Sequence, residues 1–201
     1  KAAAEIGDGL KVRVEWMVAD MLDRAQVRAL AAEAAKRLGK IDILVNNAGS
    51  NQPQAIDEIT DEAWDRIVEL DLTSCMALTR ELVPAMKARK WGRVIHISSV
   101  LGVGSKEKRN VYSACKAALI GLAKASAIDL GTFNVTVNCL CPGPFLTDIA
   151  RAWTREARES MPNALRRAGQ PSEIVTAALY LASPASSFTT GTLVRVDGGM
   201  V

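Results

Sequence analysis

The sequence predicts an α/β protein in which one parallel sheet is covered by helices on both faces. Short apolar runs alternate along the chain with longer stretches that have helical spacing. Continuous apolar runs are typical of strands that are buried on both sides, which occurs mainly in parallel sheets. We therefore expect three layers, α/β/α, with a doubly wound parallel sheet in the middle.

The first part of the chain is expected to contain two strands, each followed by a helix. Residues 12–16 are predicted to form a strand, and residues 23–38 an alanine-rich helix that Gly39 ends. Residues 41–45 form a continuous apolar run and are predicted to be the next strand, covered on both faces.

The long helix that follows is expected to begin at Thr60, whose hydroxyl can cap the first turn. Asp61 and Glu62 lie in that turn, where negative charge is favourable. The helical pattern continues towards Arg89, and Pro84 is expected to kink it. The remaining predicted elements are strands at residues 94–97, 135–140 and 193–196 and helices at residues 111–130 and 171–182.

Composition narrows the class of protein. The 201 residues suit one domain, and 49% apolar with 23% charged residues is typical of a globular protein with a core. A net charge of +3 is too small to suggest nucleic-acid binding. No uninterrupted apolar run reaches the ~18 residues of a membrane span, and the first residues do not resemble a secretory signal. We expect a cytoplasmic protein without nucleic-acid or membrane partners.

Metal binding is not expected. The chain has a single histidine, His96, and four cysteines at positions 75, 115, 139 and 141, which are too few and too scattered for a zinc site. Buried, reduced thiols are the plainer interpretation. His96 lies in the middle of a predicted strand, so we expect it to be packed in the core rather than catalytic.

Tyr112 and Lys116 are candidates for proton transfer. They are four residues apart at the start of a predicted helix, so they share one face. A lysine ammonium beside a phenol favours the phenolate, and a tyrosine of this kind can exchange a proton with a carbonyl or alcohol oxygen. Taken alone, the spacing also fits an ordinary pair on a helix surface.

Polar or small residues follow three of the predicted strands. Asn46, Asn47, Ala48 and Gly49 come after the strand at 41–45, Ser98 and Ser99 after 94–97, and Pro142 and Gly143 after 135–140, with Thr147 beyond. Each segment alone could be a simple turn. The carboxyl ends of parallel strands meet at one edge of a sheet, however, so together they predict a shared site.

These motifs, with their order and spacing, resemble the short-chain dehydrogenase/reductase family. The match rests on Asn46-Asn47-Ala48-Gly49, Ile97-Ser98-Ser99, Tyr112-x-x-x-Lys116, Pro142-Gly143 and the ending Val196-Asp197-Gly198-Gly199. It is most similar to the group of 3-oxoacyl-acyl-carrier-protein reductases and sugar or polyol dehydrogenases. The resemblance implies a Rossmann-like oxidoreductase that moves hydride between NAD or NADP and a small carbonyl or alcohol.

The resemblance also implies roles for individual residues. Ser99 would orient the substrate oxygen, Tyr112 would be the acid/base, and Lys116 would tune Tyr112 and bind the nicotinamide ribose. On the cofactor, Asp20 and Met21 would lie by the adenine, Asn47, Ala48 and Gly49 on the adenosine side, and Pro142, Gly143 and Thr147 at the nicotinamide end.

Two features depart from the family pattern. Asp71 stands where the family usually has a catalytic Asn, and we treat it as an altered fourth catalytic residue. The glycine-rich turn that opens the family fold is also absent, residues 1–6 look like the end of a helix, and the chain starts with Lys. We therefore expect a single domain over residues 1–201 in which a first strand-helix-strand unit, on the order of 30 residues, is missing.

Two other functions remain open, and assembly adds a further expectation. Without the glycine-rich turn, the chain could be an inactive fragment or scaffold that cannot bind cofactor. A nucleotide-sugar epimerase or dehydratase shares the Tyr-x-x-x-Lys spacing, although such enzymes usually carry a further C-terminal domain.

Lys106, Lys108 and Arg109 could favour an anionic substrate or form a solvated loop. Small residues on the helix at 111–130 allow close approach of a second helix, and the family resemblance implies a homodimer or homotetramer.

Overall fold

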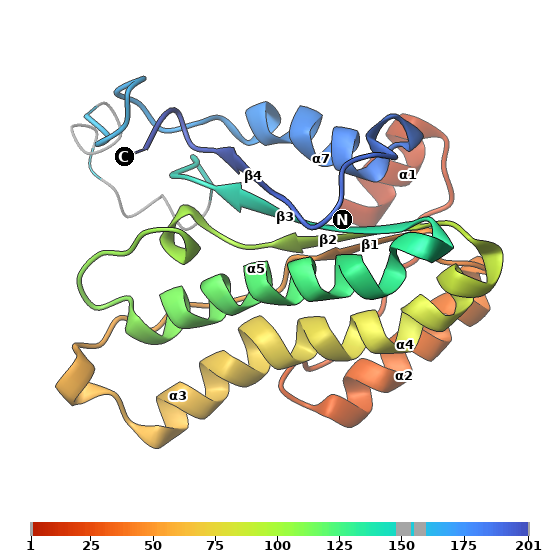
Figure 1. The fold of residues 1–201 in the computed structure, drawn as a ribbon, viewed down its shortest axis with the longest axis horizontal. Helices are drawn as coiled ribbons and strands as arrows, with labels where there is room; N and C mark the ends of the chain where they lie inside the picture. The colour runs from red at the N-terminus through yellow and green to blue at the C-terminus, as the bar shows by residue number, and fades with distance from the viewer. Residues whose placement is uncertain (1, 148–153, 155–159, 201) are drawn as a thin grey trace.

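The computed structural model describes residues 2–147, 154 and 160–200, which form a parallel sheet between two layers of helices (Figure 1). The strands are β1 (Ile43–Asn46), β2 (Gly92–Ile97), β3 (Val135–Pro142) and β4 (Leu193–Val196). They lie in chain order across the sheet, and each adjacent pair is parallel. The predicted α/β class, with its Rossmann-like three-layer arrangement, is confirmed.

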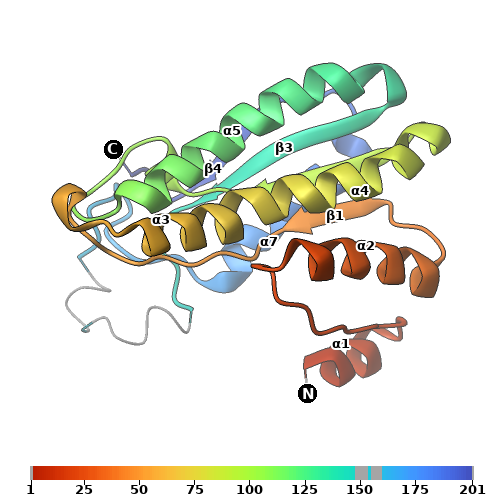
Figure 2. The ribbon, with the colours of Figure 1, turned by 90° about the horizontal axis from the view of Figure 1, so that it is seen from below.

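Helices cover the sheet on both sides, as Figure 1 shows. On one face lie α2 (Arg24–Leu38), α3 (Asp61–Val68), α4 (Ser74–Arg89) and α5 (Asn110–Leu130), and on the other lies α7 (Val175–Ala182). The main core forms between α4, α5 and the strands, and a smaller cluster joins β2 and β3 to α7. Helix α1 (Ala2–Leu10) lies at the periphery, past α2 in Figure 2 and on the α7 side of the sheet in Figure 1.

Local signals account for the ends of α2. The Asp23 carboxylate accepts hydrogen bonds from the backbone N–H groups of Ala25 and Gln26, which satisfies two of the free donors at the helix start. Gly39 follows the last residue with φ of 77°, a conformation that a side chain disfavours. The helix predicted at residues 23–38 is therefore confirmed, one residue shorter.

The strand predicted at residues 12–16 is wrong, and this segment has no regular secondary structure. It crosses between α1 and α2 (Figure 2) and pairs with no strand in the described part of the chain. Within the described residues β1 likewise pairs only with β2, and its Ile43 and Val45 side chains remain 42% and 49% exposed rather than covered on both faces. Apolar, β-branched sequence favours an extended chain, but a strand also requires a neighbour.

The long helix predicted from Thr60 is interrupted, but not at Pro84. Thr60 caps α3 as predicted, and Pro84 lies inside α4. The break is the π-helical turn η2 (Glu69–Thr73), in which the Ser74 N–H donates to the Glu69 carbonyl five residues earlier. Such a turn accommodates one extra residue, a feature that often occurs at functional sites. It carries Asp71, which is fully buried.

Helix α5 is the central helix of the larger core. Together with the turn that follows it, α5 is long and apolar enough to cross a membrane, judged by length and composition only. Part of that apolar character is explained by packing, since Leu119, Ala123 and Ala127 are buried against the sheet. Its start and end agree with the predicted helix to within one residue.

The packing of α5 generates a prediction for stability. Leu119 is 0% exposed within the main cluster, so Leu119→Ala should lower the free energy of unfolding by roughly 2–5 kcal/mol. Urea denaturation would measure the change. Lys124→Ala, at an exposed position on the same helix, is the control and should shift the free energy by less than about 0.5 kcal/mol. Equal effects from both variants would contradict this description of the core.

Candidate active site

The segments singled out in the sequence meet at one edge of the sheet. The parallel register aligns Asn46 of β1 with His96 of β2, and His96 with Cys139 of β3. The residues that follow these strands therefore emerge on the same side (Figure 1). The carboxyl edge of a parallel sheet is where doubly wound folds form their binding sites. The parallel register therefore brings the ends of the three strands together, as the sequence predicted.

A buried ion pair lies at the centre of this edge. Lys116 Nζ of α5 is 3.3 Å from Asp71 Oδ2 of η2, and their side chains are only 5% and 0% exposed. Lys116 Nζ also donates to the Ile97 carbonyl at 3.1 Å, while Asp71 Oδ1 accepts from the Ser50 N–H at 2.8 Å. The pair therefore connects α5, η2, the end of β2 and the loop after β1.

The surroundings of Asp71 oppose its ionisation. Burial raises the pKa of the Asp71 carboxyl above its ordinary value of 3.8, and the nearby Lys116 ammonium and the Ser50 N–H only partly offset that effect. Its Oδ2 accepts no hydrogen bond from the described residues and faces Lys116 instead. Sequence reasoning placed Asp71 beside the lysine by resemblance, and the structure brings the two together.

Tyr112 and Lys116 share one face of α5, as predicted from their spacing. Lys116 Nζ is 5.4 Å from the centre of the Tyr112 ring, and Tyr112 is partly exposed while Lys116 is buried. An ammonium at this distance from an aromatic face is attracted to it. The tyrosine is thus partly accessible from outside, whereas the charge of Lys116 is held inside the protein.

The two adjacent serines have different roles. Ser98 Oγ donates to the Lys116 backbone carbonyl at 2.7 Å, so this hydroxyl holds α5 against β2. Ser99 Oγ accepts from the Leu101 N–H at 3.1 Å and caps the short helical turn η3 (Val100–Gly102). That bond uses the Ser99 oxygen and leaves its O–H as a donor. Of the two hydroxyls, only that of Ser98 donates a hydrogen bond to another of the described residues, so Ser99 stays the candidate for a substrate oxygen.

Close backbone approaches surround this cluster. A Cβ on Gly49 would lie 3.1 Å from both Asp71 Oδ2 and Lys116 Nζ, and a Cβ on Gly102 would lie 2.7 Å from the Lys116 carbonyl carbon. Glycine at these positions lets the loop after β1 and the turn η3 approach the ion pair. Sequence reasoning missed Gly102 and the clamp formed by Ser98, since neither has a local signature.

The remaining residues predicted to bind cofactor lie around the same edge, with one exception. Asn47, Ala48 and Gly49 follow β1, and each of them is exposed or partly exposed. Pro142 ends β3, and the Gly143 N–H donates to the Val196 carbonyl at 2.9 Å. Thr147 is exposed, at the last described position before a gap in the described residues.

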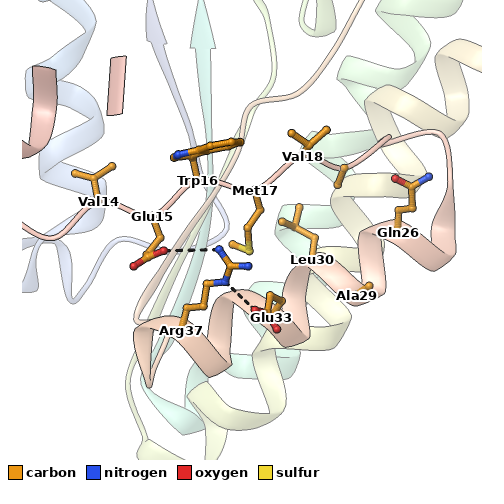
Figure 3. Close-up of a pocket in the computed structure, with 11 residues that line it drawn as sticks. Val14, Glu15, Trp16, Met17, Val18, Gln26, Ala29, Leu30, Glu33 and Arg37 are labelled. Atoms are coloured by element: carbon orange, nitrogen blue, oxygen red, sulfur yellow. Dashed lines mark hydrogen bonds and ion pairs between the residues drawn. The ribbon is translucent and has the colours of Figure 1, made fainter. Parts of the chain in front are cut away.

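Asp20 and Met21 are the exception, because they follow no strand of the sheet in the described part of the chain. Asp20 instead hydrogen-bonds to Leu22 and to Gln26 of α2. The preceding segment lines a cleft of about 590 Å³ against α2, in which Arg37 lies between Glu15 and Glu33 (Figure 3). None of the predicted catalytic residues lines this cleft, so its size does not make it the reactive site.

Comparisons with known proteins agree with this geometry. The family model described as enoyl-(acyl carrier protein) reductase matches residues 1–201. Nodulation protein G of Rhizobium sp. (strain N33) is 38% identical over 98% of this chain and 80% of its own length. A 3-oxoacyl-[acyl-carrier-protein] reductase of Thermotoga maritima is 33% identical over 96% of this chain and 80% of its length. The chain belongs to the short-chain dehydrogenase/reductase family.

The solved structures extend the likeness to three dimensions. A candidate gluconate dehydrogenase of Agrobacterium tumefaciens superimposes with a TM-score of 0.91 at 26% identity, over 98% of this chain and 79% of that protein. This short-chain dehydrogenase/reductase therefore has the family fold over 98% of the chain. It belongs to a family of oxidoreductases. The matched relatives are longer, since the chain spans about 80% of each.

The buried carboxyl of Asp71 generates a prediction for pH dependence. A raised pKa in the folded state means that the folded protein holds the proton more tightly, so the Asp71 contribution to stability is present below pH 3.8 and lost as pH rises through the folded value. Asp71→Asn removes this titration. The free energy of unfolding of the variant minus that of wild type should therefore increase as the pH is raised from 4 to 7. Urea denaturation at each pH would measure this difference.

The matched control for this prediction is Asp65→Asn, an exposed aspartate on α3. Its difference from wild type should vary much less with pH than that of Asp71→Asn. A stability difference between Asp71→Asn and wild type that stays constant over the same range would show that the burial of Asp71 does not control its ionisation.

Proposed function

We propose that this protein transfers hydride between a nicotinamide cofactor, NAD or NADP, and a small carbonyl or alcohol substrate. The observation that carries the proposal is the position of Lys116 Nζ, 5.4 Å from the centre of the Tyr112 ring and 3.3 Å from Asp71, at the carboxyl edge of the sheet. The relatives named as reductases and the candidate dehydrogenase support the same class of reaction.

The proton moves through Tyr112. In the reductive direction its hydroxyl gives a proton to the substrate oxygen, and the Lys116 ammonium stabilises the phenolate that remains until solvent protonates it again. The O–H of Ser99 donates to the same oxygen and holds the carbonyl in place. When bound, the cofactor supplies the hydride that reaches the carbonyl carbon, and the oxidative direction reverses each transfer.

The residues present fit a nicotinamide cofactor. A lysine ammonium has three N–H donors, and Lys116 Nζ donates one to the Ile97 carbonyl and lies 3.3 Å from Asp71 as an ion-pair partner. At least one N–H would therefore be available to the hydroxyls of a ribose. Asn47, Ala48 and Gly49 provide small residues for the adenosine side. Pro142, Gly143 and Thr147 would hold the nicotinamide end, and Asp20 and Met21 would lie by the adenine.

Tyr112→Phe is the test of this mechanism. Removing the hydroxyl takes away the proton donor but leaves the ring against Lys116, so turnover should fall at least ~10²-fold while cofactor affinity changes little. Steady-state assays with NAD(H) and NADP(H) would use a panel of carbonyl and alcohol substrates that includes a 3-oxoacyl thioester and gluconate. Calorimetric titration would measure cofactor binding.

The control is Tyr180→Phe, the same chemical change at the other tyrosine of the chain. The Tyr180 hydroxyl hydrogen-bonds to Thr189 on the α7 side, so turnover should stay within about twofold of wild type. Turnover of Tyr112→Phe within a few-fold of wild type would remove Tyr112 from the mechanism. A wild-type protein that binds neither cofactor would favour a scaffold role.

We further propose that the protein acts as a homodimer or homotetramer in the cytoplasm. A groove of about 190 Å³ runs between α4 and α5, lined by Met76, Val83 and Leu122 among others. Exposed small residues of α5, including Gly121 and Ala125, permit close helix approach from a second copy. The four free, buried cysteines support a reducing compartment.

Assembly can be tested at Ile128, which is 82% exposed on α5. Light scattering on the wild type should show a dimer or tetramer at micromolar concentration, and Ile128→Glu should shift it towards monomer because a charge would be buried at the interface. Ile56→Glu, at a position 73% exposed in η1 (Ile56–Glu58), should leave the mass unchanged. A wild type that is monomeric throughout would refute the proposed assembly.

A further inference from the structure

A second polar cluster lies in the core, next to the site but not part of the proposed chemistry. His96 of β2 is 0% exposed, and it contacts Asn46 of β1, which is 3% exposed, and through it Thr79 of α4. His96 was expected to be packed, and it is. Its hydrogen bond to the residue that begins the Asn46–Asn47–Ala48–Gly49 turn was not foreseen.

The hydrogen bonds of Asn46 determine which groups donate. Asn46 Nδ2 is 3.4 Å from the Cys75 carbonyl, 3.2 Å from Thr79 Oγ1 and 3.0 Å from His96 Nδ1. The Thr79 hydroxyl already donates to the Cys75 carbonyl at 2.7 Å, so its oxygen can only accept. Reversing the amide would place its oxygen against the Cys75 carbonyl, which can only accept, and the Thr79 hydroxyl could donate to it only by giving up its own bond to that carbonyl. Asn46 therefore donates, and His96 Nδ1 accepts.

This assignment fixes the chemical state of His96. An imidazole that accepts at Nδ1 is neutral and carries its proton on Nε2, a buried nitrogen that has no hydrogen-bond partner among the described residues. Burial and the positive charge of Lys116 lower the pKa of His96 to about 4, and the nearby Cys75 and Cys139 thiols stay neutral because burial raises their pKa values. An imidazolium would also point an N–H at the Asn46 amide. Neutral His96 adds no second positive charge near Lys116.

We propose that His96 is a positioning residue whose neutral Nδ1 holds Asn46, and through it the Asn46–Gly49 turn, in the place required for cofactor binding. The expected effect on cofactor binding rests on the proposed function. The hydrogen bond between His96 and Asn46 is independent of that function. Gly49 ends this turn against Asp71 and Lys116. The hydrogen bonds to Asn46 therefore hold the start of the loop after β1, and the ion pair of Asp71 and Lys116 lies against its end at Gly49.

The state of His96 can be read directly, because it is the only histidine in the chain. Nitrogen-15 NMR of the imidazole in the whole protein should show a single Nε2–H tautomer that does not change between pH 5 and pH 8. An Nδ1–H tautomer, or a titration within that range, would overturn the proposal. This measurement needs neither cofactor nor substrate, so its outcome is independent of whether the proposed function is correct.

The positioning role is tested with a pair of variants. His96→Asn places an amide oxygen near the position of Nδ1 and should keep the bond to Asn46, whereas His96→Gln extends its amide further and should lose it. His96→Gln should weaken binding of the preferred nicotinamide cofactor about tenfold, as expected for one lost buried hydrogen bond, and His96→Asn should stay within about threefold of wild type. Equal affinities for the two variants would overturn the role.

A second readout covers a wild type that binds no cofactor. The backbone amide signals of Asn47, Ala48 and Gly49 should shift in His96→Gln and remain near their wild-type positions in His96→Asn. Val94→Ala, in the same strand and buried in the main core, is the control and should lower stability without moving those signals. Turn signals that respond to Val94→Ala as strongly as to His96→Gln would reduce His96 to a packing residue.

Discussion

The arrangement of the site depends on two opposite charges kept almost entirely out of water. A buried lysine or aspartate alone would be strongly unfavourable, and the pair persists because each member also has a backbone partner, Ile97 for Lys116 and Ser50 for Asp71. Because four separate segments contribute these groups, the geometry around Lys116 follows from the fold as a whole. Tyr112 is then placed relative to Lys116 by a single turn of helix.

Polar groups continue from this pair beneath α4 and α5. Asn46, His96 and Ser98 all turn towards the helices that also contribute Thr79 and Lys116, and each makes a hydrogen bond there or to its neighbour. The rest of this interface is apolar. Asn46 Oδ1 and His96 Nε2 already lack a hydrogen-bond partner among the described residues, so a rearrangement that leaves a further donor or acceptor unpaired would be costly. The candidate site at the carboxyl edge of the sheet is in this way supported by buried hydrogen bonds between the strands and α4 and α5.

Most elements could be predicted from the sequence because their signals are local. Asp23 and Gly39 bound α2 through contacts within a few residues, and the strand at 193–196 was identified to the residue. The segment at 12–16 could not be identified in this way, because pairing depends on what lies beside it. The π-helical turn also has no local signature. Ser98 and Ser99 are adjacent and chemically identical, so only their contacts with α5 and η3 separate the clamp from the candidate ligand.

The π-helical turn at Glu69–Thr73 has a consequence for how this chain tolerates change in length. Each residue advances an α-helix by about 100°, and a π-helical turn takes up one extra residue without rotating the helix beyond it. The loss of one residue within the turn would therefore be absorbed by a return to α-helix, with Cys75, Thr79 and Val83 still facing the core. Asp71 would lose its inward position instead, so we expect the loss of a single codon there to damage the site far more than the core.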